Sequence, residues 1–520
     1  MNVNYFFLLN IFISFLSATN YYVATSYGND TNNGTSINTP FKTIAKAASV
    51  MSSGDICYIR QGRYHETVTI NNLDGSSGSA IIFTNYNNER VIMDGTIPIT
   101  STWTQVGSSN IWRTKLSSDI WQLFLDWEEQ VMARWPNAKF SDNTIWDNDN
   151  YWAKGTIDDD ENAYSNGTII DDPYTNSAGT TINLSAAGFD LDETNKQAIA
   201  ILNLGSFRTW SRLVTSHSGN TFNYSTVPNW KTKHHYYFLE GRREFLDQAG
   251  EWWYDTYNNA DSLYYYANNG VDPNRLNFRG KVQSYAFSIT GSEYIQIKNI
   301  EFFGTTVYFS NGDNCVVYGC NFMYPSCSKR MLRTVDTEPE MTKFASGSTG
   351  SAIRNCAFRN TDGTALEMWG GTDTVDNCYF TNIDYSVADN SSIMLTMRMN
   401  GTANVFRKNT VHRTGASATV MVGDAGLVEY NNLYDTGHLQ SDGSMIQFME
   451  DQQDGAICRY NWLHDTEKYG ARFDHSGTAD GTNGTMHHNL AWNCESGGIM
   501  VKGDNHKVYN NTVLNSGSKN

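Results

Sequence analysis

The chain has 520 residues and a formal net charge of −17, with 18% charged and 13% aromatic residues. Its length excludes a disulfide-held miniprotein, its composition excludes a disordered chain, and its surplus of acids argues against nucleic acid as the main partner. Many aromatic residues and only 8 prolines indicate a β-rich protein.

The N-terminus carries one strongly apolar stretch, residues 6–16, followed by the small residues Ser17 and Ala18. It is too short to span a membrane, so residues 1–18 are predicted to be a signal peptide, although no Lys or Arg precedes the stretch. A buried first strand is the alternative interpretation. We expect a secreted, periplasmic or cell-surface protein with no membrane span.

Residues 19–98 contain an extended segment, a short helical pattern at 41–50 and a strand and turn at 54–64. This segment is predicted to be an N-terminal cap with the first rungs of a solenoid, because a solenoid must cover its open end. Residues 99–281 lack the repeat of about 22 residues that marks the C-terminal half of the chain. Alternating runs such as 121–126 predict an inserted β-rich domain there. Its acidic stretch, 158–161, could hold calcium, although such a stretch is more often a solvated loop.

Residues 282–520 repeat one phrase, an asparagine followed three residues later by an aromatic residue, His or, at the last, Leu. The steps between successive asparagines are 22, 34, 22, 32, 22, 30, 28 and 22 residues, for the markers Asn299, Asn321, Asn355, Asn377, Asn409, Asn431, Asn461, Asn489 and Asn511. A fixed unit of about 22 residues that carries loop insertions explains these steps.

A unit of this length has room for three short strands and their turns but not for a helix of ten residues. Stacked copies predict an all-β fold, a parallel β-helix with asparagine ladders at its turns. The eight cysteines show no metal-binding or disulfide spacing and are interpreted as buried small hydrophobic residues. Because the last phrase is followed by no cap, we expect the coil to be truncated at its C-terminus.

Two stretches support a family resemblance. The segment from Tyr21 to Tyr64, with Pro40-Phe-Lys-Thr-Ile and Gly54-Asp, resembles the entry segment of secreted right-handed parallel β-helix proteins, many of which act on polysaccharides. The stretch Trp121–Asn137 resembles the inserted β-domain of β-helix glycoside hydrolases. The resemblance implies architecture more than reaction, since hydrolases, lyases and adhesins share the coil.

An outward column of polar residues on the rungs is the predicted site of chemistry. Side chains alternate along a strand, so the residues after each turn can be aligned. The predicted column contains Glu367, Met421, Gln447, Asp474 and Lys502, with Arg472 and Arg398 beside it. Charged residues concentrate between His438 and Asp474, more densely than scattered surface charge, although surface pairing is the plainer interpretation of any single member.

Three functions compete. A glycoside hydrolase needs one protonated and one ionised carboxyl group. We assign Asp474, with Glu450 or Asp442, as this catalytic pair, Glu450 being the acid if its loop buries it. Substrate binding is assigned to Arg472, Lys468, Gln447, Lys502, His438, Glu367 and Arg398.

The alternatives are a polysaccharide lyase, with Lys468, Lys502 or a tyrosine as base and Arg472 or calcium neutralising a uronate, and a non-catalytic glycan-binding or adhesive solenoid. The acid-rich segment favours hydrolysis. No metal site is assigned and hydrolysis requires no cofactor. A polysaccharide or oligosaccharide is the expected partner of a monomeric protein.

Overall fold

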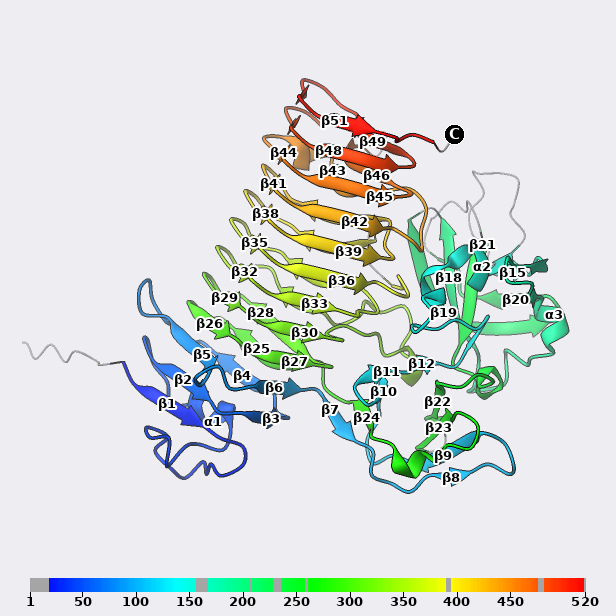
Figure 1. Cartoon of the computed structure of the whole chain (residues 1–520), viewed down its shortest axis with the longest axis horizontal. Helices are drawn as coiled ribbons and strands as arrows, with labels where there is room; N and C mark the ends of the chain where they lie inside the picture. The colour runs from blue at the N-terminus through cyan, green and yellow to red at the C-terminus, as the bar shows by residue number, and fades with distance from the viewer. Residues whose placement is uncertain are drawn as a thin grey trace, which may run out of the picture.

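The computed structural model describes residues 18–155, 167–205, 207–227, 235–257, 261–389, 394–475 and 481–518. Three long parallel sheets, A, B and C, run through most of this chain, and each circuit of the chain adds one strand to each sheet. The predicted parallel β-helix is confirmed (Figure 1). The predicted signal peptide, apart from Ala18, and the acidic stretch 158–161 lie outside the described residues.

The strands of each sheet follow one another along the coil axis. Sheet A contains β1 (Asn20–Val23), β2 (Ile56–Ile59), β5 (Ile81–Asn85), β26 (Ile295–Lys298), β29 (Val316–Tyr318), β32 (Ala352–Arg354), β35 (Thr374–Asp376), β38 (Val405–Arg407), β41 (Leu427–Glu429), β44 (Ile457–Arg459), β47 (Thr485–His487) and β50 (Lys507–Tyr509). Sheet B contains β3 (Gly62–Tyr64), β6 (Val91–Asp94), β27 (Glu301–Phe303), β30 (Asn321–Met323), β33 (Ala357–Arg359), β36 (Tyr379–Ile383), β39 (Thr410–Thr414), β42 (Asn432–Thr436), β45 (Trp462–Thr466), β48 (Leu490–Cys494) and β51 (Thr512–Leu514). Sheet C contains β4 (Val68–Asn71), β25 (Tyr285–Thr290), β28 (Thr306–Ser310), β31 (Thr342–Phe344), β34 (Leu366–Met368), β37 (Leu395–Met399), β40 (Ala418–Val422), β43 (Ser444–Met449), β46 (Tyr469–Asp474) and β49 (Gly497–Val501).

The coil is interrupted between β6 and β25, where the chain builds a separate β-rich unit and then returns to pair β25 with β4. We call this unit the inserted domain. Its strands are β7 (Thr96–Pro98), β8 (Thr104–Gln105), β9 (Ile111–Lys115), β10 (Leu123–Leu125), β11 (Glu128–Glu129), β12 (Val131–Met132), β13 (Arg134–Trp135), β14 (Ala153–Gly155), β15 (Thr168–Ile170), β16 (Tyr174–Thr175), β17 (Thr181–Ile182), β18 (Ile199–Gly205), β19 (Arg208–Ser218), β20 (Thr221–Tyr224), β21 (His235–Glu240), β22 (Glu251–Asp255), β23 (Ser262–Tyr266) and β24 (Phe278–Lys281).

Helices are few and short. They are α1 (Ile44–Ala48), α2 (Asn148–Tyr151), α3 (Leu184–Ala187), η1 (Thr144–Trp146), η2 (Arg243–Phe245), η4 (Pro273–Arg275), η5 (Arg330–Leu332) and η6 (Glu450–Gln453). The predicted helix near residues 41–50 is α1, which buries Ile44 and Ala47 in the core of the coil. Its first N–H groups, on Ile44 and Ala45, donate to Glu66 at 3.0 Å each. In the described part of the chain no helix is long and apolar enough to cross a membrane.

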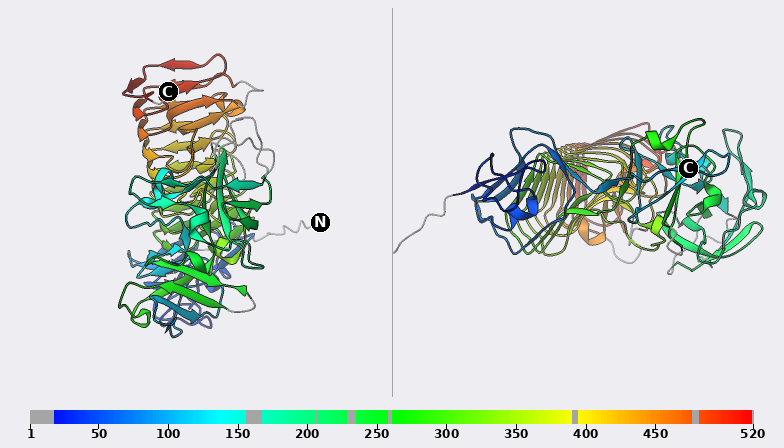
Figure 2. Two further views of the ribbon diagram at one scale, coloured as in Figure 1. Left: turned by 90° about the vertical axis from the view of Figure 1, so that its right-hand side faces the viewer. Right: turned by 90° about the horizontal axis from the view of Figure 1, so that it is seen from below.

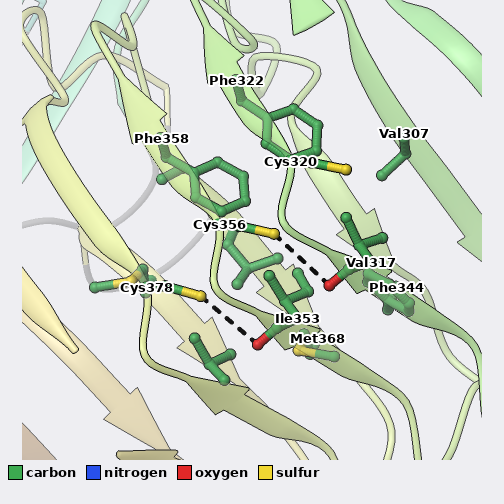
Figure 3. Packing of buried hydrophobic residues seen from close by; sticks show 14 of the residues in the cluster. Val307, Val317, Cys320, Phe322, Phe344, Ile353, Cys356, Phe358, Met368 and Cys378 are labelled. Carbon is green, nitrogen blue, oxygen red and sulfur yellow. Dashed lines mark hydrogen bonds between the residues drawn. The ribbon is translucent and has the colours of Figure 1, made fainter. Parts of the chain in front are cut away.

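The interior of the coil is built from ladders of identical side chains. Phe322 stacks on Phe358 with ring centroids 4.6 Å apart, and Phe358 on Phe380 at 5.0 Å. Figure 3 shows Phe322 and Phe358 beside a row of cysteines, of which Cys356 and Cys378 direct their sulfur atoms to backbone carbonyls of the neighbouring rung. All eight cysteines are buried and free, which confirms their predicted role as small hydrophobic residues.

The nine asparagine markers lie on successive rungs, but they do not form the single aligned set that the phrase suggests. Asn299, Asn355 and Asn377 occupy a left-handed turn position before sheet B, with φ of 55° each, and Gly319 takes that position on the rung between. Asn321 lies two residues further on, inside β30. Asparagine tolerates left-handed backbone angles and also bonds along a ladder, so one phrase marks several positions.

The remaining five markers form a ladder one residue after that turn, buried except at the partly exposed Asn511, and they are Asn409, Asn431, Asn461, Asn489 and Asn511. Asn431 illustrates the pattern. Its amide donates to Asn461 Oδ1 at 2.9 Å and to the Phe406 carbonyl at 3.0 Å, while its Oδ1 accepts the Asn409 N–H at 2.9 Å. This side chain therefore satisfies two backbone groups of the preceding rung and bonds to the asparagine side chain of the following rung.

Substituting Asn431 by alanine should lower the free energy of unfolding by about 3 kcal/mol, because it leaves the buried Phe406 carbonyl and Asn409 N–H without partners. The matched control is Asn377→Gly, which keeps the left-handed turn and removes only an exposed hydrogen bond to Asn355. Chemical denaturation of both variants measures the difference. Equal stability of the two variants would contradict a structural role for the buried ladder.

The inserted domain packs beside the coil, against the loops that lead from sheet B to sheet C (Figures 1 and 2). A joint apolar cluster contains Trp146, Trp152 and Phe238 from the domain and Tyr385 and Leu439 from the coil. A buried ion pair adds to this contact, since Arg330 binds Glu240 of the domain and Asp362 of the coil. The loops between sheets B and C thus form one wall of an interface.

Candidate active site

A cavity of about 520 Å³ lies at this interface. We call it the interface cavity. The inserted domain contributes residues from 128–146 and 248–251, and the coil contributes Tyr324, Asn360, Asn382 and Tyr385. Cavities between packed units that combine apolar walls with a few polar groups are the usual place for small-molecule sites.

The strand pair β10–β11 carries two glutamates to the cavity. Asp126 and Trp127 both have positive φ and close a tight turn between the strands, which places Glu129 opposite Phe124. The Phe124 ring lies 4.9 Å from the rings of both Phe303 and Tyr324 on the coil. This apolar contact fixes the strand pair against sheet B.

Glu129 has an unequal environment at its two carboxyl oxygens. Oε1 accepts hydrogen bonds from the Tyr385 hydroxyl at 2.6 Å and from Gln122 Nε2 at 2.8 Å, whereas Oε2 is buried with no hydrogen-bond partner. Burial raises the pKa of Glu129 to about 8, against the opposing effect of these two hydrogen bonds. The group is therefore a carboxylic acid at neutral pH, with its proton on Oε2.

Glu251, the first residue of β22, has a similar environment. Its Oε2 accepts the N–H groups of Gln248 at 3.0 Å and Asp247 at 3.1 Å, and its Oε1 is buried without a hydrogen bond. Burial raises the pKa of Glu251 to about 8, although neighbouring backbone N–H groups oppose the shift. The cavity therefore holds two protonated carboxyl groups at neutral pH.

Glu128 is the third carboxyl group of the cavity and is exposed to solvent. Its Oε2 accepts the Tyr324 hydroxyl at 3.3 Å, and the same hydroxyl accepts the Glu129 N–H at 3.5 Å. Burial raises the pKa of Tyr324 above its usual range, so this hydroxyl keeps its proton and remains a donor to Glu128.

Asparagines and aromatic rings form the rest of the wall. Asn360 and Asn382 both adopt left-handed backbone angles, with φ of 59° and 56°, and the Asn382 amide donates to Asn360 Oδ1 at 3.0 Å. The Phe140 ring meets the Tyr385 ring edge to face at 4.9 Å. Amides beside aromatic faces suit a ligand with hydroxyl groups around an apolar ring.

Five of the residues predicted from sequence meet elsewhere, on the outer face of sheet C. Arg472 lies 2.6 Å from Asp442 and also contacts Asp474, whose carboxylate is 2.7 Å from Lys502 Nζ and accepts Gln447 Nε2 at 3.1 Å. Burial alone would raise the pKa of both carboxyl groups, but Arg472, and Lys502 at Asp474, hold each pKa below its usual range. Both aspartates are therefore ionised and bound by cations.

Glu367 and Arg398 form a separate cluster on the same face. The fully buried Glu367 lies 2.8 Å from Lys343 and 3.5 Å from Arg398, and it accepts Trp369 Nε1 at 2.9 Å. In the strand register of sheet C, Met421 lies between Arg398 of this cluster and Gln447.

The predicted outward column is confirmed for Glu367, Met421 and Gln447 and wrong for Asp474 and Lys502. The register places in one column Glu367, Arg398, Met421, Gln447 and Arg472. Asp474 instead pairs with Met449, two residues further along its strand, and Lys502 follows the end of β49. Residues i and i+2 share a face, so alternation alone does not fix the register.

The last three predicted residues are dispersed. Glu450 is partly exposed at the start of η6, directly after the register partner of Asp474. Lys468 lies nearly buried in the turn before β46, with Nζ 3.9 Å from Glu467. His438 binds Asp435 at 3.0 Å, and its ring lies 6.3 Å from that of Trp146, which lines the interface cavity.

The carboxyl pair predicted from the sequence did not include Glu129 or Glu251. A signal was present, because Glu128 and Glu129 lie inside the stretch Trp121–Asn137 that resembles the inserted domain of glycoside hydrolases. Glu251 lies 122 residues after Glu129, and only the pairing of β12 with β22 brings the two regions together. Among the residues that the structure describes, no three His, Cys, Asp or Glu side chains are placed to hold a metal ion.

Comparisons with known proteins agree on the architecture. Residues 344–513 match the family model described as a right handed beta helix region. A solved structure titled "Glycoside hydrolase" superposes with a TM-score of 0.64 and 14% sequence identity, covering 96% of this chain and 97% of that chain. The fold is therefore a right-handed parallel β-helix, as predicted.

Two further comparisons are more distant or more local. The crystal structure of pectate lyase Pel9A gives a TM-score of 0.34 and 11% identity, covering 95% of this chain and 80% of that chain. The uncharacterized protein YwoF of Bacillus subtilis (strain 168) is 41% identical over 68 residues, which are 13% of this chain and 14% of YwoF.

Proposed function

We propose that the protein is a secreted glycoside hydrolase that uses Glu129 as its general acid in the interface cavity. The observation that carries the proposal is the carboxyl group of Glu129, whose Oε1 is occupied by two donors and whose unpartnered Oε2 bears the proton at neutral pH. A protonated carboxyl group in a cavity is what cleavage of a glycosidic bond requires.

The exposed Glu128 supplies the second carboxyl group. In the proposed reaction the proton moves from Glu129 Oε2 to the glycosidic oxygen as the bond from this oxygen to the anomeric carbon breaks. Glu128 then either attacks the anomeric carbon or takes a proton from an attacking water. If Glu128 attacks, a water molecule then breaks the bond between Glu128 and the anomeric carbon, giving its hydroxyl to the sugar and its proton to Glu129. If Glu128 acts as the base, it holds the proton of the attacking water, and Glu128 loses a proton and Glu129 regains one by exchange with solvent, so each cycle consumes one water in either case.

The cavity favours hydrolysis over elimination. A lyase needs a base to remove a proton beside a uronate carboxylate and a cation to neutralise this carboxylate. Burial raises the pKa of Tyr385 and Tyr324 further above their usual range, which makes both hydroxyls poor bases. Lys139 is the one basic side chain among the described residues that line the cavity.

The pair proposed from the sequence remains a second location. Asp442 and Asp474 both have lowered pKa values, so neither supplies a proton at neutral pH, and Glu450 would have to be the acid there. Variants of both locations, described in the Discussion, separate them. Export through the N-terminal segment, a polysaccharide or oligosaccharide substrate and a monomeric state belong to the same proposal.

The reaction class can be tested by incubating the protein with plant and algal polysaccharides, oligosaccharides and nitrophenyl glycosides, and weighing the products. Hydrolysis gives saturated products that together gain one water per bond cleaved, whereas elimination gives a product lighter by one water. Products of elimination would overturn the proposal. The absence of any product with a substrate that binds in the cavity would favour a binding protein.

A pH profile gives a further prediction. Hydrolysis should fall as pH rises through about 8, because Glu129 loses its proton there. Stability should decrease over the range from about 4.3, the ordinary glutamate pKa, to about 8, because over this range the folded state holds protons at Glu129 and Glu251 that the unfolded chain releases. Thermal denaturation between pH 5 and pH 8 measures this loss, and Glu251→Gln should reduce it. A stability that rises over this range would contradict the assignment.

A further inference from the structure

The interface cavity is lined by buried oxygen atoms that lack hydrogen-bond partners, of which the amide oxygens are acceptors and each carboxyl oxygen becomes one when its group ionises. Four buried oxygens with no hydrogen-bond partner belong to its lining residues, and they are Glu129 Oε2, Gln248 Oε1, Glu251 Oε1 and Asn382 Oδ1. No buried donor nitrogen among the described lining residues is left without a partner. A buried acceptor without a donor costs about 1–3 kcal/mol, so a ligand that brings donors recovers this free energy.

The charges of the cavity point the same way. Three glutamates and one lysine line it. Glu251 is 1% exposed and Glu129 is held against Tyr385, so neither can turn to bulk solvent to become ionised. A cation that enters would pair with the carboxylate that forms when a glutamate releases its proton. An anion would be repelled by the exposed Glu128.

We propose that the sugar residue bound in the interface cavity carries a free amino group, which pairs with Glu251. An ammonium group offers three donors and a positive charge, so it can bind the amide oxygens of Gln248 and Asn382 and stabilise the carboxylate that Glu251 forms when it releases its proton, which a hydroxyl group cannot do. The inference rests on the proposed function, since it concerns the same cavity and names its substrate class. Glu129 remains the acid, and the nearby ammonium lowers the pKa of Glu129 toward neutrality.

Calorimetric binding tests the inference with matched sugars that differ at one substituent. Glucosamine is compared with glucose and N-acetylglucosamine, and galactosamine with galactose and N-acetylgalactosamine. At least one amino sugar should bind about tenfold more tightly than both of its uncharged counterparts, as expected for a charge-assisted hydrogen bond. Titrations in buffers of different ionisation enthalpy should show proton release on binding, because Glu251 ionises.

Glu251→Gln should abolish both the preference and the proton release, while Glu301→Gln, on the surface of sheet B, should leave both unchanged. Equal binding of an amino sugar and its uncharged counterparts, or no binding of any, would overturn the inference. Hydrolysis of the corresponding nitrophenyl glycosides is measured separately. An amine preference without hydrolysis would refute the proposed function alone, and hydrolysis without the preference would refute the inference alone.

Discussion

Glu129→Gln should reduce turnover by about 10²–10⁴-fold, because glutamine retains the shape of the side chain but donates no proton to the leaving group. The Tyr385 hydroxyl and Gln122 can still donate to its carbonyl oxygen, so the fold should be preserved. The measurement is turnover on the substrate found by the product screen. Binding of substrate should change much less than turnover.

The leaving group provides a sharper readout than the loss of activity itself. A dinitrophenyl glycoside needs little protonation as it departs, so Glu129→Gln should retain far more activity on this substrate than on an unactivated one. The matched control is Asp474→Asn, which removes a carboxyl group that is held ionised by Arg472 and Lys502. Normal turnover in Glu129→Gln together with loss in Asp474→Asn would move the active site to the outer face of sheet C.

Arg330→Met should lower the free energy of unfolding by about 3–5 kcal/mol, because it leaves two buried carboxylates without their cation. Arg330 is 1% exposed, and its guanidinium lies 2.8 Å from Asp362 and 3.0 Å from Glu240. Burial alone would raise the pKa of Asp362, yet Arg330 holds this pKa below its usual range, so removal of the arginine leaves an ionised group inside the protein.

Arg90→Met is the matched control for Arg330, since Arg90 pairs with Glu301 at the same distance of 2.8 Å on the exposed surface of the coil. Its loss should change stability by less than about 1 kcal/mol. Adding Asp362→Asn to Arg330→Met should restore part of the stability if unpaired charge is the cause. Equal stability of Arg330→Met and Arg90→Met would refute the role of the buried pair.

The coil could be predicted because its physical cause is periodic. Each rung has a residue with left-handed backbone angles at the turn before sheet B. Asparagine tolerates these angles, so Asn355 and Asn377 recur 22 residues apart. The alignment of those rungs could not be predicted, because asparagine serves both the turn at Asn377 and the interior at Asn409. Pairing across the sheet, set by packing, decided between them.

The candidate cavity could not be predicted for a different reason. Glu129 and Glu251 are ordinary glutamates in the sequence, and their raised pKa arises from burial between two units that are distant along the chain. Dense charge, which the sequence does display around Asp474, proved to consist of carboxylates paired with cations. Local charge density therefore reports salt bridges more readily than it reports acids that hold a proton.

The hydrogen bonds of Glu129 make its reactivity conditional on assembly. Gln122 belongs to the inserted domain and Tyr385 to a loop of the coil, and only their meeting shields Glu129 from water. A chain whose two halves have not docked would expose Glu129, which would then ionise like any surface glutamate. A molecule whose tertiary structure is incomplete would therefore lack the proposed acid, so folding itself would be the activating step of the proposed hydrolase.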